Sequence, residues 1–151
     1  VRACKLLGLI QRVSSASASI DNTVVGTIDQ GLLLLLGIEK TDLEAAADKL
    51  LQKILNYRVF ADSEGKMNLS LRDIGGELLV VSQFTLAADT NKGLRPSFSA
   101  AASPEQAEEL YDYFLTQAAT ALNTQIQSGL FGADMQVMLH NDGPVTFMLR
   151  S

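Results

Sequence analysis

The apolar residues in the first quarter of the chain follow the spacing of β-strands. Residues 9–13 and the alternating residues 15–20 predict two strand segments, and Asp21-Asn22 predicts a turn into a strand at Thr23–Ile28. In residues 32–38 the apolar side chains follow one another without a break, so they cannot alternate between a core and solvent. We therefore expect a central strand there, covered on both faces.

Two later stretches carry the spacing of amphipathic helices. Thr41 followed three residues later by Glu44 forms a capping-box pattern, and the apolar residues after it predict a helix over residues 42–56. Ser103, Pro104 and Gln106 predict the start of a second helix. One face of this helix is apolar: Ala107, Leu110, Tyr111, Phe114 and Ala118. We assign its two aromatic residues to core packing.

Between the helices, the pattern returns to strands and turns. Residues 58–60 predict a short strand and residues 62–66 a turn. The Gly75-Gly76 pair predicts a turn into Glu77–Ser82, whose uninterrupted apolar run indicates a strand buried on both faces. Residues 87–102 lack a periodic pattern, and so long a loop suggests a functional role.

The last part of the chain predicts two closing strands, at residues 135–140 and 145–149, joined by a turn at Asn-Asp-Gly-Pro. Strands therefore gather in runs and do not alternate strictly with helices. This order favours an α+β fold, a mainly antiparallel, barrel-like sheet with two main helices packed on one side.

Length and composition narrow the class of protein. A chain of 151 residues suits one domain with a sizeable core, so we predict a single domain over residues 1–151. The longest aliphatic run, residues 32–36, is far shorter than the roughly 20 residues of a membrane span, which indicates a soluble protein. With one cysteine, Cys4, the chain can form no internal disulfide, which fits the cytoplasm.

The net charge of −5 argues against a protein that binds long stretches of nucleic acid, because that affinity comes mainly from cationic side chains. It leaves room for a small, local contact with one RNA end. Lys66, Lys92 and Arg95 are candidates for phosphate contacts, although each also fits an ordinary solvated surface charge.

The chain offers no convincing set of ligands for a metal or cofactor. Cys4 and His140 are too few for a structural zinc site, and the spacing of the aspartates forms no known metal-binding loop. No glycine-rich nucleotide-binding motif is present. We therefore expect an activity that needs no cofactor and survives chelators. His140, the only histidine, is assigned a structural role rather than a place in a catalytic triad.

Uncharged polar residues follow the buried strand at Glu77–Ser82, where a rigid strand can present them to a ligand. Ser82, Gln83 and Thr85 also fit a purely local role, in which their side chains satisfy the backbone. Thr85 is the obvious candidate nucleophile, but a threonine hydroxyl without an adjacent base is weak. The residues alone leave both interpretations open.

Residues 82–90, SQFTLAADT, and residues 141–146, NDGPVT, closely resemble the two signature motifs of the D-aminoacyl-tRNA deacylases, which clear D-amino acids from mischarged tRNA. The resemblance covers nearly all of residues 9–149. It includes four further segments: LIQRV at 9–13, GLLLLLGIEK at 31–40, GKMNL at 65–69 and LRPSFS at 94–99. Residues 1–7 have no counterpart in the family pattern and are expected to be an N-terminal extension.

The resemblance implies a cytoplasmic homodimer that hydrolyses the ester of D-aminoacyl-tRNA, and of glycyl-tRNA mischarged on tRNA(Ala), while rejecting L-aminoacyl substrates. It assigns catalysis to Ser82, Gln83, Phe84 and Thr85. It assigns substrate binding to Leu86, Asn141, Gly143, Pro144, Val145, Thr146 and Arg12. It also implies that the 141–146 motif enters the site of the partner subunit, with Arg12 fixing its orientation.

The implied chemistry relies on the substrate. The ester of an aminoacyl-tRNA lies beside a free ribose hydroxyl, so the protein needs only to position the ester and to supply backbone donors, such as the N–H groups around Phe84, to the developing oxyanion. Two alternatives stay open. One is a different ester or thioester hydrolase with Thr85 as a covalent nucleophile, and the other is a non-catalytic module that binds charged tRNA.

Overall fold

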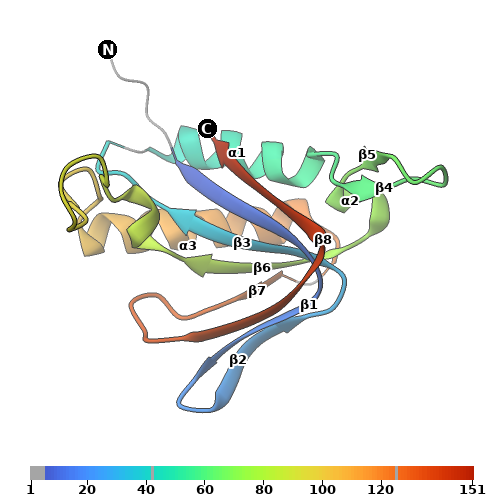
Figure 1. Ribbon diagram of the computed structural model, residues 1–151, viewed down its shortest axis with the longest axis horizontal. Coiled ribbons are helices and arrows are strands. Elements are labelled where there is room, and N and C mark those ends of the chain that lie inside the picture. The colour runs from blue at the N-terminus through green and yellow to red at the C-terminus, as the bar shows by residue number, and fades with distance from the viewer. Residues whose placement is uncertain (1–5, 42, 125) are drawn as a thin grey trace.

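The computed structural model of the chain describes residues 6–41, 43–124 and 126–151 (Figure 1). Within these residues one curved sheet has six strands, in the order β2-β1-β3-β6-β7, with β8 also paired to β1. Its strands are β1 (Leu7–Ile20), β2 (Thr23–Ile28), β3 (Gly31–Gly37), β6 (Glu77–Ser82), β7 (Ile126–Ser128) and β8 (Gln136–Arg150). A small second sheet contains β4 (Phe60–Ala61) and β5 (Met67–Leu69). The helices are α1 (Glu44–Asn56), α2 (Leu71–Ile74), α3 (Pro104–Ala121) and a 3-10 helix, η1 (Phe84–Ala87).

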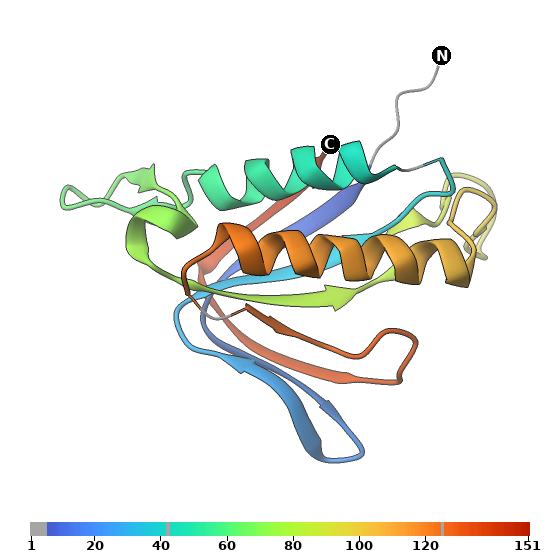
Figure 2. The same ribbon diagram turned by 180° about the vertical axis from the view of Figure 1, so that it is seen from behind.

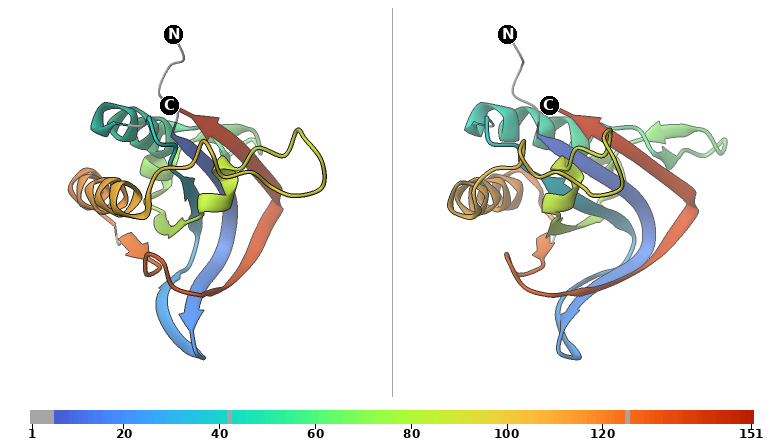
Figure 3. Two further views of the ribbon diagram at one scale, coloured as in Figure 1. Left: turned by 90° about the vertical axis from the view of Figure 1, so that its left-hand side faces the viewer. Right: turned by 60° about the vertical axis from the view of Figure 1, so that its left-hand side comes forward.

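The main sheet is mixed. β1 pairs antiparallel with β2, β3 and β8, whereas β3, β6 and β7 are parallel neighbours. Parallel pairs need a long crossover connection, and the chain places α1 between β3 and β6 and α3 between β6 and β7. The curvature brings β2 back toward β7, where the Thr27 amide N–H donates to Oε1 of Gln127 at 3.4 Å. The predicted α+β, barrel-like fold is confirmed, and the sheet nearly closes on itself (Figure 3).

The two main helices cover one face of the sheet, as predicted. Figure 2 shows α1 and α3 side by side across that face. Leu34 of β3 packs toward the helices, whereas its neighbour Leu33 belongs to a second cluster on the opposite face. Val80 and Val81 of β6 divide in the same way. Both strands are therefore buried on both faces, which explains why their apolar residues run without alternation.

β1 and β8 are each one long strand, where the sequence predicted two segments. Asn141 of β8 pairs with Val13, and Thr146 pairs with Gln11, so the four residues 142–145 lie opposite the single residue Arg12. We call residues 142–145 the Gly-Pro bulge. The predicted reversal at Asn-Asp-Gly-Pro was wrong, because β8 continues along β1 on both sides of the bulge.

The two helix starts differ in how well the sequence predicted them. The Ser103 hydroxyl accepts from the Gln106 amide at 3.2 Å, as expected for α3. The predicted capping box at Thr41 and Glu44 was wrong, because α1 begins at Glu44 with Leu43 in the N-cap position and no side-chain cap bond. Its expected first residue, at position 42, lies outside the described residues.

Several short elements depart from the predicted pattern. The strand expected at residues 58–60 begins at Phe60, and α2 was not predicted. A capping box between Ser70 and Asp73 starts α2, and Gly75, in the left-handed conformation, ends it. The expected glycine turn is therefore a helix C-cap. In the loop before β5, the Asp62 carboxylate accepts from two backbone amides, as the predicted turn requires.

Both ends of the described chain meet at β1. Leu6 is fully buried, and its amide N–H donates to the Ser151 hydroxyl at 2.8 Å. Leu7 begins β1, so the last two residues of the expected N-terminal extension are part of the fold. Its first five residues, with Cys4, lie outside the described part. Among the described helices, none has the length and apolar character needed to cross a membrane.

Candidate active site

The 82–90 motif begins where β6 leaves the sheet. Ser82 pairs with Leu36 of the parallel strand β3, and the Gln83 amide N–H donates to the Leu36 carbonyl oxygen at 2.8 Å. The chain then turns into η1, where the Leu86 amide donates to the Gln83 carbonyl oxygen at 3.2 Å. Two buried strands therefore hold the start of the motif, and Phe84 and Thr85 are exposed at the start of η1, whereas Ala87 at its end is buried.

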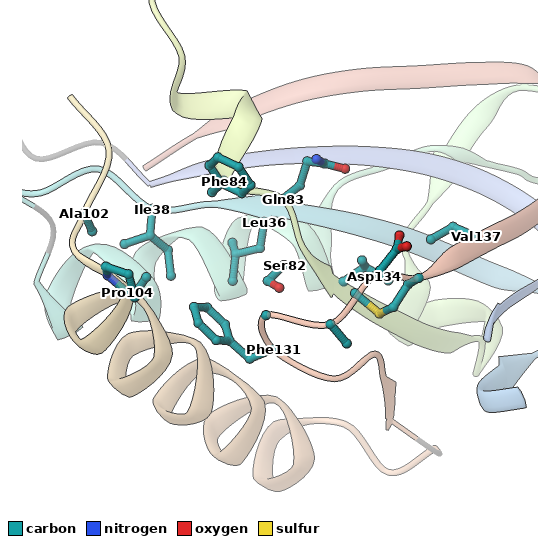
Figure 4. Close-up of a pocket in the computed structure, with 15 residues that line it drawn as sticks. Leu36, Ile38, Ser82, Gln83, Phe84, Ala102, Pro104, Phe131, Asp134 and Val137 are labelled. Atoms are coloured by element: carbon teal, nitrogen blue, oxygen red, sulfur yellow. The ribbon is translucent and has the colours of Figure 1, made fainter. Parts of the chain in front are cut away.

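A cavity of about 440 Å³ opens beside this exit (Figure 4). Ser82, Gln83 and Phe84 form one side of it, and the start of α3 with Pro104 forms another. The segment between β7 and β8 supplies the facing wall, including Phe131. Most lining side chains are apolar, and Asp134 is the only charged residue among the described residues that line the cavity. Such a space suits a flat organic group with few polar atoms.

The Thr85 hydroxyl lies next to Gln83. The Gln83 side-chain amide donates from Nε2 to Oγ1 of Thr85 at 2.6 Å. An amide N–H is a donor, so this neighbour cannot take a proton from the hydroxyl. His140 lies on β8, where it pairs with Ser15 of β1. Because β1 and β3 separate β8 from β6, His140 is not placed to act as a base for Thr85. Phe84, by contrast, is 62% exposed, and its ring lies 5.2 Å from that of Phe98 in the following loop.

The Gly-Pro bulge has its own network of hydrogen bonds. The Asn141 side chain accepts from the Val145 amide at 2.6 Å and donates to the Thr146 hydroxyl at 2.9 Å. The Gly143-Pro144 peptide bond is cis, and Gly143 has φ +146°. Asn141 therefore closes the bulge across its base, while Gly143 and Pro144 stay exposed.

Arg12 lies directly opposite the bulge and binds it. Its Nε donates to the Asp142 carbonyl oxygen at 2.8 Å, and NH1 donates to the Val59 carbonyl oxygen at 2.7 Å. The Asp142 carboxylate is 3.8 Å from Nε, which adds an ion pair. The structure thus brings Arg12 and the 141–146 motif together.

The structure does not bring the two motifs together within one chain. β3 and β1 lie between β6, which carries the 82–90 motif, and β8, which carries the 141–146 motif. Along β3, the exit of β6 is level with Leu36, whereas Arg12 pairs with Leu32. No residue of the 141–146 motif lines the cavity. The predicted site residues therefore form two separate groups.

A family described as D-Tyr-tRNA(Tyr) deacylase matches residues 9–150 of the chain. The chain belongs to this family. It is 68% identical over 142 residues to the D-aminoacyl-tRNA deacylase of Pseudoalteromonas translucida (strain TAC 125), an alignment that covers 94% of this chain and 97% of the relative. It is 64% identical over 144 residues to that of Cellvibrio japonicus (strain Ueda107), covering 95% and 98%. The predicted family is confirmed.

Two solved structures have the same fold as this deacylase-family chain. A protein titled c-Myc DNA Unwinding Element Binding Protein superimposes with a TM-score of 0.92 at 41% identity, covering 96% of this chain and 98% of the other. A probable eukaryotic D-amino acid tRNA deacylase superimposes with a TM-score of 0.83 at 16% identity, covering 97% and 100%. The second likeness is one of fold alone.

Sequence reasoning missed one wall of the cavity in this member of the deacylase family. Phe131 and Asp134 belong to the segment between β7 and β8, which the sequence pattern left unassigned, and Met135, predicted to begin the closing strand, lies just before β8. The sequence signal for this segment is weak, because only an aromatic residue, Phe131, between Gly129 and Gly132 marks it. Gly129 packs so closely that an added Cβ would lie 2.5 Å from the Met135 sulfur.

The remaining predicted residues lie around the edge of the site. Leu86 faces a second, more polar hollow with Asp89 and Arg150. Lys92 and Arg95 are exposed in the loop that follows η1, and Lys66 lies beside Glu64, with 3.9 Å between their charged atoms, before β5. Three or more His, Cys, Asp or Glu side chains do not gather around a metal-sized space anywhere in the described residues.

Proposed function

We propose that this chain is a D-aminoacyl-tRNA deacylase, an ester hydrolase that releases a D-amino acid from mischarged tRNA. The observation that carries this proposal is the family match over residues 9–150, together with relatives of that name that align over nearly their whole length. It acts in the cytoplasm, where it proofreads charged tRNA for translation.

The cavity beside Ser82 binds the terminal adenosine of the tRNA. Its volume of about 440 Å³ and its apolar lining suit a nucleobase, which proteins commonly hold against aromatic rings. Phe84 and Phe131 lie at two of its sides and offer such rings (Figure 4). With the base held here, the ester lies near η1. Lys92 and Arg95 are exposed in the loop that follows η1, and we assign them contacts with the tRNA phosphates.

The protein positions the ester, and the substrate supplies the acid–base group. The first N–H groups of a 3-10 helix have no carbonyl partner within that helix, and in η1 these belong to Phe84 and Thr85. They donate to the oxyanion that forms when water attacks the ester carbonyl. The free ribose hydroxyl beside the ester orients that water, and the proton passes to the departing ribose oxygen. Within the described residues the Thr85 hydroxyl hydrogen-bonds the Gln83 amide and no basic side chain, so it does not need to act as a nucleophile.

The active enzyme is a twofold-symmetric homodimer. Because the two motifs lie apart in one chain, a second copy supplies its Gly-Pro bulge to the site beside η1. Exposed apolar residues on β8 favour a buried contact there, including Met138 at 70%, Met148 at 41% and Phe147 at 38% exposure. An isologous contact would complete two equivalent sites at once.

The Gly-Pro bulge separates mirror-image substrates by obstruction. The carbonyl groups of Gly143 and Pro144 accept from the α-ammonium of the amino acid, and the rigid backbone fills the direction in which an L side chain would project. A D side chain points outward and needs no pocket. Glycine has no side chain to clash, so glycyl-tRNA is accepted as well.

A deacylation assay with purified protein tests the proposal. D-Tyr-tRNA should release tyrosine at a rate that rises in proportion to enzyme, and light scattering should give twice the mass of one chain. The absence of any release would favour a non-catalytic charged-tRNA-binding module. A fully active monomer would contradict the shared site without contradicting the activity.

A further inference from the structure

Tyr111 lies behind the cavity. There it contacts two segments that form opposite walls of the cavity, the exit of β6 and the segment around Phe131. The residue belongs to α3 and is 2% exposed. Its hydroxyl is 3.1 Å from the Val80 carbonyl oxygen of β6 and 3.3 Å from the Gly129 carbonyl oxygen. The Gly129 amide also donates to the Val80 carbonyl at 2.9 Å. One hydroxyl therefore lies at the junction where the two segments meet.

Each of these carbonyls lies two residues before a residue that lines the cavity. Val80 precedes Ser82 at the exit of β6, and Gly129 precedes Phe131 on the opposite wall. The rings of Tyr111 and Phe131 are also in contact, with centroids 5.8 Å apart. Tyr111 therefore contacts both carbonyls through its hydroxyl and one wall through its ring, without lining the cavity itself.

The tyrosine hydroxyl keeps its proton at every working pH. Burial raises the pKa of Tyr111 to about 12, a rise that outweighs the opposing effect of a hydrogen bond with the Ser128 side chain. The hydroxyl is thus always available as a donor to the backbone carbonyls. A phenylalanine in its place would keep the ring contact and lose only the hydrogen bonds.

We propose that Tyr111 is a positioning residue that sets the affinity of the cavity for the terminal adenosine of the substrate, by holding the β6 exit and the segment around Phe131 at a fixed spacing. The inference rests on the proposed function. If the hydroxyl is removed, the Gly129 carbonyl loses this donor, while the Gly129 amide can still bind Val80. The wall is loosened but not lost, so binding weakens and the reacting groups at η1 stay in place.

The chain offers a matched control on the same helix. Tyr113 also uses its hydroxyl to join two elements, since it donates to the Asp48 carboxylate of α1 at 2.8 Å. Its side chain does not line the cavity. Tyr113→Phe therefore removes a tyrosine hydrogen bond of α3 without changing the support behind the cavity.

The test compares Tyr111→Phe with Tyr113→Phe in steady-state deacylation of D-Tyr-tRNA. For Tyr111→Phe we expect KM to rise about 2- to 10-fold, the change that corresponds to one ordinary hydrogen bond, with kcat within about twofold of the wild type. The inhibition constant of free adenosine, used as a competitive inhibitor, should rise by the same factor as KM. Tyr113→Phe should leave both constants unchanged, even if it melts at a lower temperature.

If Tyr111→Phe fails to fold, fluorotyrosine incorporated at the three tyrosines keeps the inference testable by ¹⁹F NMR. Adenosine should then shift the Tyr111 resonance and leave that of Tyr113 in place. An unchanged KM, a loss confined to kcat, or equal effects of the two variants would overturn the inference and leave the deacylase function standing. A wild type that releases no tyrosine would overturn the proposed function and the inference with it.

Discussion

The guanidinium of Arg12 donates from Nε to the backbone carbonyl oxygen of Asp142 at 2.8 Å, and from NH1 to that of Val59 at 2.7 Å. Its side chain is only 14% exposed. Arg12 faces the whole Gly-Pro bulge across the β1–β8 pairing. One side chain thus ties the bulge both to the strand beneath it and to the segment that follows α1.

We expect Arg12→Lys to lower kcat/KM at least about tenfold while the protein stays folded. Lysine keeps the charge, but its single ammonium cannot reproduce the planar fork that serves two carbonyls in different directions. Loss of one such charge-assisted bond costs about 1.5–3 kcal/mol. Deacylation kinetics and thermal melting of the same preparation measure the two effects separately.

Lys53→Met is the control for that variant. Lys53 also binds a carbonyl of β8 with its charged group, that of Arg150 at 3.4 Å, but at the end of the strand away from the bulge. Normal kinetics in Lys53→Met, beside a clear loss in Arg12→Lys, would tie the effect to the bulge. Wild-type kinetics in Arg12→Lys would remove Arg12 from the site.

A bulky residue at Gly143 should abolish activity. Gly143 has φ +146°, and even an added Cβ would lie 2.7 Å from the Val145 side chain and 2.9 Å from the Val145 amide nitrogen. Gly143→Leu therefore has to displace the bulge that, in our proposal, holds the α-ammonium. Gly65→Ala is the control, because Gly65 also has a positive φ but has open space where a Cβ would lie. Substantial turnover by Gly143→Leu would mean that the bulge does not contact the substrate.

Thr85→Ala should retain substantial activity. The Thr85 hydroxyl accepts from the Gln83 amide and hydrogen-bonds no basic side chain among the described residues, so we assign the chemistry to backbone donors and to the substrate. Single-turnover deacylation of D-Tyr-tRNA measures the remaining rate. If this variant is inactive with its fold intact, and an acyl-enzyme can be trapped on the wild type, the covalent mechanism is the better account.

Handedness provides the most direct test of the obstruction model. D-Tyr-tRNA and Gly-tRNA should be hydrolysed, and L-Tyr-tRNA should be rejected, as should every other L-aminoacyl-tRNA, because the Gly-Pro bulge is rigid backbone and cannot retreat. Release from all three, each on matched tRNA, is measured under the same conditions. Comparable hydrolysis of L-Tyr-tRNA would refute obstruction, and rejection of glycine would show that the D side chain is itself recognised.

The sequence by itself determined the elements whose residues all favour one structure. The strand at Glu77–Ser82 begins and ends where the pattern predicted, because an apolar run between a glycine pair and polar residues has few alternatives. The start of α3 was also predictable, since Ser103 and Pro104 satisfy a helix N-terminus locally. The family motifs at residues 82–90 and 141–146 were recognisable for the same reason, because they are contiguous.

Only the tertiary structure decided what depends on partners far along the chain. Asn-Asp-Gly-Pro suits a hairpin turn as well as a bulge, and the choice was made by Arg12 and the long pairing of β8 with β1, more than a hundred residues away in sequence. The cavity wall at Phe131 likewise exists because Tyr111 and Val80 meet the segment around Gly129. Local residue preferences are weak where two backbone paths are both allowed, so the path is chosen by whichever long-range contacts bury the most surface and satisfy the most backbone groups.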